Sequence, residues 1–73
     1  MEPNSESKTL ADELPREMSR VREILGEYKK LGHVGAFGAV MIEQDLRAAD
    51  HAVMSGDVLQ MLRSLSTLRD ISW

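Results

Sequence analysis

The sequence contains no cysteine, which excludes disulfide bonds as a source of stability. Its two histidines, His33 and His51, do not have the spacing of a zinc site. No apolar run approaches the ~20 residues of a transmembrane helix, and the acidic N-terminus lacks the basic and apolar regions of a signal peptide. We therefore expect a cytoplasmic protein that holds no metal or cofactor and does not enter the membrane.

Aromatic residues and positive charge are also scarce. Phe, Tyr and Trp occur once each, and the net charge is -3 at pH 7. Such a chain has neither overall attraction to phosphate nor the interleaved aromatic residues that stack on bases, so nucleic acid is not an expected partner. The basic residues Arg16, Arg20, Arg22, Lys29 and Lys30 offer a possible contact with phosphate or an acidic protein. We favour a solvated face with the ion pairs Glu17 to Arg20 and Glu27 to Lys30.

With 73 residues, the chain is large enough for one domain only. Burial of apolar area at roughly 25 cal/mol per Å² only about cancels the entropy lost on folding in so small a protein. Most proteins of this size need a disulfide, a metal or a partner chain. Since the first two are not expected here, we expect self-association, most simply as a two-fold dimer.

Hydrophobic periodicity predicts a first helix from about residue 13 to 31. Leu14, Met18, Val21, Leu25 and Tyr28 follow one another at steps of four and three, which places them on one side of a helix. Pro15 fits the first turn, and Gly32 is a stop signal. The polar residues before this helix predict a disordered tail over residues 1–8 and a single helical domain over residues 9–73.

A central helix is predicted for residues 35–55. Its apolar side consists of Gly35, Gly38, Ile42, Leu46, Ala49 and Val53. The glycines suggest that another backbone comes close, but residues 32–38 are equally consistent with a loop.

A third helix is predicted for residues 58–71, with Asp57 as its N-cap and Gln60 completing a capping box. Together these elements predict an all-α, three-helix bundle: a long helical hairpin plus a capped C-terminal helix, completed by dimerisation.

A second apolar cluster, of Ala36, Phe37 and Val40, lies opposite the main stripe of the central helix. We expect the dimer or partner interface to consist of Gly35, Phe37, Gly38, Val40, Met41 and Trp73. If residues 32–38 form a loop, Phe37 instead closes the end of the bundle. Trp73 is expected either to pack back onto the bundle or to contact a partner.

Asp45 falls within the apolar sector of the central helix, where an ionised carboxylate is costly unless it is paired. It is a candidate for a buried polar group that binds an arginine of the first helix or fixes the register of a dimer. The alternative is that the apolar side of the central helix is narrower and that Asp45 lies at its solvent-exposed edge.

No residue set indicates an enzyme. The glycines at 32, 35 and 38 match neither a dinucleotide-binding nor a Walker motif, and no serine or threonine has an identifiable base partner. We predict an interaction or adaptor protein, of a kind common among small bacterial and phage proteins. The alternative is a DNA-associated regulator whose last two helices form a helix-turn-helix, with Arg63, Ser64, Thr67 and Arg69 facing the major groove.

Overall fold

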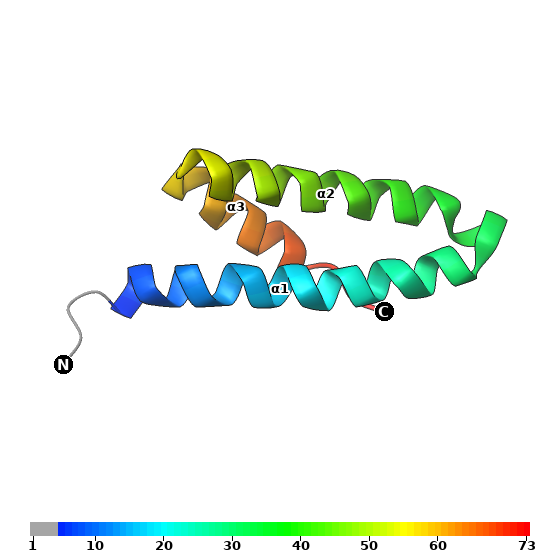
Figure 1. Cartoon of the computed structure of the whole chain (residues 1–73). Helices are drawn as coiled ribbons and strands as arrows, with labels where there is room; N and C mark the ends of the chain where they lie inside the picture. Colours follow the sequence, from blue (N-terminus) through cyan, green and yellow to red (C-terminus); the bar gives the residue numbers. More distant parts are fainter. Residues whose placement is uncertain (1–4) are drawn as a thin grey trace.

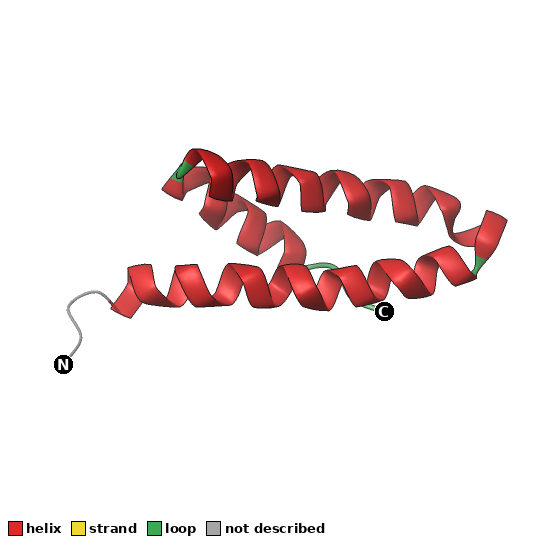
Figure 2. Ribbon diagram, viewed as in Figure 1, coloured by secondary structure: helices red, strands yellow, loops and turns green. Residues whose placement is uncertain are grey.

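The computed structural model describes the backbone of residues 5–73 and the side chains of residues 10–73. Its elements are α1 (Ser5–Lys30), the short 3-10 helix η1 (Gly32–Gly35), α2 (Ala36–Ser55) and α3 (Val58–Arg69) (Figures 1 and 2). The described part of the chain contains no strand. The predicted all-α fold of three helices is therefore confirmed.

Helices α1 and α2 form a long antiparallel hairpin, and α3 folds back beside it (Figure 1). Each pair of the three helices is in contact. They enclose one apolar core, which consists of Leu10, Leu14, Met18, Val21, Ile42, Leu46, Ala49, Leu65 and Leu68. The molecule is elongated, with extents of 48 × 23 × 15 Å.

Helix α1 begins at Ser5, earlier than the predicted start near residue 13. The reason is that Leu10 is buried in the core and continues the apolar side of α1 beyond Leu14. Pro15 consequently lies inside the helix instead of in its first turn, with its ring exposed. Of the tail predicted for residues 1–8, residues 5–8 belong to α1, and residues 1–4 lie outside the described residues.

Residues 32–38 were expected to be either helix or loop, and the structure shows a short turn followed by the start of α2. Gly32 ends α1 with a φ of 61°, in the left-handed region that favours glycine. Residues Gly32–Gly35 form η1, and α2 begins at Ala36, so Phe37 and Gly38 are helical. The hairpin therefore closes through one tight turn.

The turn between α2 and α3 follows the predicted capping chemistry. Gly56 has a φ of 69°, and its N–H donates to the carbonyl groups of Ala52 and Val53. Asp57 then accepts a hydrogen bond from the backbone N–H of Gln60 at 3.2 Å. The N-cap of α3 is confirmed, although the helix ends at Arg69, before the predicted residue 71.

Candidate functional site

More large apolar side chains are exposed than buried in this protein. Among the side chains that the structure describes, eight large hydrophobic residues and three alanines are buried, whereas eleven large hydrophobic residues are exposed. Ten of the eleven exposed residues fall into two groups, and the eleventh is Trp73. One group is near η1 and contains Leu31, Val34, Phe37, Val40 and Met41, and the other is around the α2–α3 turn and contains Val53, Met54, Val58, Leu59 and Leu62.

The group near η1 lies where the hairpin has no third helix beside it. Helix α3 has 12 residues and α2 has 20, and α3 ends midway along the hairpin (Figure 1). At 1.5 Å per residue, α3 is therefore about 12 Å shorter than α2. The end of the hairpin near η1 consequently lacks the cover that α3 gives to the other end.

Contacts between the helices define the two sides of this hairpin. On one side, Lys29 of α1 pairs with Glu43 of α2 at 3.0 Å. On the other side, Arg20 of α1 contacts α3. Met41 lies two residues from Glu43, about 200° around the helix, and therefore faces the α3 side, which it shares with Phe37 four residues earlier.

We define the open face as five exposed apolar residues near η1 and the C-terminal segment: Leu31, Val34, Phe37, Met41 and Trp73. Tyr28, which is half-buried, links two parts of this region. The Tyr28 ring packs against Gly38, where an added Cβ would lie 2.6 Å from Tyr28 Cε2. The Trp73 ring packs on Tyr28 with a centroid distance of 5.0 Å and a tilt of 51°.

The two glycines of the predicted interface make contacts within the chain. Gly35 is buried, and a side chain there would clash with the backbone carbonyl of Tyr28. Gly38 is filled by the Tyr28 ring. The backbone that approaches Gly35 closely is therefore that of α1 in the same chain. Neither glycine leaves a space that a second chain could fill.

The other predicted interface residues are all exposed. Phe37 is 78% exposed, and Trp73 is 69% exposed although it packs back onto Tyr28. Val40 is also exposed and lies three residues after Phe37, so these two side chains are neighbours on α2. Met41 lies four residues after Phe37 on the same side of α2, and Trp73 packs on Tyr28.

Asp45 lies in α2, one helical turn after Met41. Its side chain is half-buried, and no ion pair to it is found among the described residues. A half-buried Asp45 agrees with the alternative that it lies at the edge of the apolar stripe of α2.

The basic residues of α1 are mostly paired with acids. The ion pairs Glu17 to Arg20 at 2.8 Å and Glu27 to Lys30 at 3.2 Å form as expected. Lys29 also pairs with Glu43 at 3.0 Å, and Arg22 pairs with Asp50 at 3.7 Å. These last two pairs join α1 to α2, so sequence spacing within one helix could not identify them. The pairing leaves little free positive charge for phosphate.

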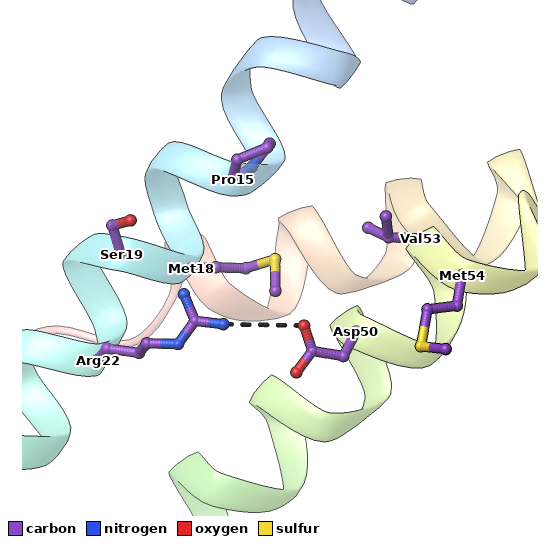
Figure 3. A pocket seen from close by; sticks show the side chains of 7 residues that line it. All are labelled: Pro15, Met18, Ser19, Arg22, Asp50, Val53 and Met54. Carbon is purple, nitrogen blue, oxygen red and sulfur yellow. Dashed lines mark ion pairs between the residues drawn. The ribbon is translucent and has the colours of Figure 1, made fainter.

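A shallow apolar groove lies between α1 and α2 near the α2–α3 turn (Figure 3). Met18 lies between the two helices, and the Arg22–Asp50 ion pair bridges them below it (Figure 3). The remaining lining residues are Pro15, Ser19, Val53 and Met54. Sequence analysis missed this groove, because it depends on how α1 and α2 pair.

Two of the four residues proposed to contact DNA are engaged within the protein. Ser64 is buried, and Arg69 pairs with Glu13 of α1 at 3.3 Å. Among the described side chains, no group of three or more His, Cys, Asp or Glu residues lies close enough to hold a metal ion. Within residues 5–73, no helix has both the length and the apolar character needed to cross a membrane.

The chain was compared with protein-family models, with curated proteins and with solved structures, and none of them matches it.

Proposed function

We propose that this protein is a small, self-associating helical interaction protein that acts as an adaptor by binding a protein partner through its helical faces. The observation that carries this proposal is the excess of exposed over buried large apolar side chains, eleven against eight in the described part of the chain. Five of the eleven lie on the open face. Contiguous apolar patches of more than a few hundred Å² are rare on soluble monomers and mark interaction surfaces.

The small size of the core supports the same proposal. Three of the eleven buried hydrophobic residues in the described part of the chain are alanines, and the chain has no cysteine. Removal of apolar surface from water contributes roughly 25 cal/mol per Å², so covering the exposed residues adds stability that the single chain lacks. Self-association would supply this stability, and the remaining exposed group around the α2–α3 turn would be available to a different protein.

Sedimentation equilibrium over a wide concentration range, with thermal unfolding followed by circular dichroism, tests the proposal. We expect a dimer whose melting temperature rises with protein concentration, because a partner that binds only the folded chain stabilises it by mass action. A chain that stays monomeric at every concentration, with a constant melting temperature, would contradict self-association.

A DNA-associated regulator has less support, because Ser64 is buried and Arg69 is paired with Glu13. Titration with duplex DNA at low salt separates the two functions. A strong affinity that falls steeply as salt is added would favour the regulator. We also propose a cytoplasmic location and no catalytic role.

A further inference from the structure

We infer that the open face is covered by the same face of a second copy of this chain, related to the first by a two-fold axis. This inference rests on the proposed function and specifies which surface performs the self-association. It assigns the contact to the end of the hairpin that carries Phe37 and Met41, and not to the exposed group around the α2–α3 turn.

The helix lengths favour a second hairpin as the occupant. The end of the hairpin near η1 is a pair of helices with no third helix against it (Figure 1). Two such ends placed face to face would form a local four-helix arrangement, in which each pair of helices covers the apolar side of the other. Each chain then contributes the same surface to the contact, as an isologous interface requires.

The exposed area is of the size that a dimer needs. Phe37 and Trp73 are 78% and 69% exposed. Since an aromatic side chain buries 150 to 250 Å², these two rings alone offer on the order of 300 Å². With Leu31, Val34 and Met41 exposed beside them, the open face approaches the roughly 800 Å² that a standard interface takes from each partner. Clustered aromatic residues are also typical of the residues that dominate binding energy.

The apolar character of the open face fits a second copy of this chain. An isologous contact brings each charge close to its own copy, so the chain, with a net charge of -3, is expected to meet itself at a surface of little charge. None of the five residues that define the open face has an ionisable side chain. Beside them, His33 of η1 is exposed, Glu27 is paired with Lys30, and Asp45 is half-buried.

Sedimentation equilibrium of matched charge variants of the full chain tests this inference. Phe37→Glu places a carboxylate in the proposed contact, and Leu62→Glu places the same charge in the exposed group around the α2–α3 turn. We expect Phe37→Glu to raise the dimer dissociation constant at least tenfold and Leu62→Glu to change it less than threefold. Both residues are exposed in the single chain, so helicity should be unchanged. Phe37→Ala replaces Phe37→Glu if helicity falls.

Single-cysteine variants test the two-fold symmetry. The chain has no cysteine of its own, so a disulfide can form only between introduced residues of two copies. Two identical residues come within the ~7 Å between Cα atoms that a disulfide allows only near a two-fold axis. We expect at least one of Leu31→Cys, Val34→Cys, Phe37→Cys and Met41→Cys to give a disulfide-linked dimer under mild oxidation faster than Leu62→Cys.

The outcomes separate this inference from the proposed function. A wild-type dimer that Leu62→Glu weakens as much as Phe37→Glu would overturn the open face as the contact and leave self-association standing. Fastest cross-linking at Leu62→Cys would do the same. A wild-type chain that is monomeric at every concentration would overturn both.

Discussion

Arg20 of α1 donates a hydrogen bond from Nη2 to the backbone carbonyl of Leu68, close to the end of α3, at 2.8 Å. The same guanidinium is held by the Glu17 carboxylate at 2.8 and 3.0 Å. A cation at a helix C-terminus satisfies a carbonyl that has no partner within the helix and opposes the negative end of its dipole. This contact fixes the last turn of α3 on α1.

Replacing Arg20 should therefore destabilise the docking of α3. For Arg20→Ala we expect a loss of about 1 kcal/mol in the free energy of unfolding, the typical net value of one hydrogen bond. Urea unfolding followed by circular dichroism measures it. Arg16→Ala is the control, since Arg16 is exposed on the same helix. Equal effects of the two changes would show that the contact with Leu68 contributes nothing.

Replacement by alanine is expected to have opposite effects on stability at Gly38 and at Gly26. At Gly38 an added methyl would lie 2.6 Å from the Tyr28 ring, whereas at Gly26 nothing lies within 4 Å. We expect Gly38→Ala to lower the free energy of unfolding by about 1 to 3 kcal/mol through overpacking. Gly26→Ala, in the interior of α1, should raise it by about 0.5 to 1 kcal/mol through helix propensity. Chemical unfolding of both variants checks the two signs, and a gain at Gly38 would contradict the contact with Tyr28.

Asp57 should behave as an N-cap. Its carboxylate accepts from the backbone N–H of Gln60, so Asp57→Ala should cost about 1 kcal/mol, while Asp57→Ser, which keeps an acceptor, should cost much less. Thermal unfolding of the two variants at one protein concentration gives the comparison. If serine proves as costly as alanine, the side-chain hydrogen bond is not the source of the effect.

Trp73 is the single tryptophan of the chain, so its fluorescence reports on the stacking with Tyr28. Tyr28→Ala removes the ring beneath Trp73, and we expect the emission maximum of the dilute protein to shift to longer wavelength as the indole gains water. Val40→Ala, at another exposed apolar residue of α2, is the control and should leave the emission unchanged. An unaltered spectrum for Tyr28→Ala would mean that Trp73 does not rest on Tyr28.

Local chemistry was enough to predict much of the fold. The apolar side of α1, the Asp57 cap, the glycine stop at Gly32 and the ion pairs Glu17 to Arg20 and Glu27 to Lys30 all depend on residues a few positions apart. The observed helices follow these signals. Spacing along one segment is what a sequence shows directly.

Contacts between helices explain what the sequence could not reveal. The start of α1 is set by Leu10 in a shared core, which overrides the signal of Pro15. The glycines of the candidate site suggested a second chain, but Tyr28 of α1 occupies the space at Gly38. The exposure of Phe37 and Met41 depends on where α3 ends along the hairpin. None of these facts is encoded by residue spacing within one helix.

Three of the five buried residues of α2 are alanines, at positions 39, 49 and 52. Alanine loses no side-chain entropy on burial, and a substitution to glycine removes only one methyl group. Helix α1 buries Leu10, Leu14, Met18 and Val21 instead. The two helices should therefore respond to substitution in opposite ways: shortening a buried side chain damages α1 most, whereas enlarging one damages α2 most.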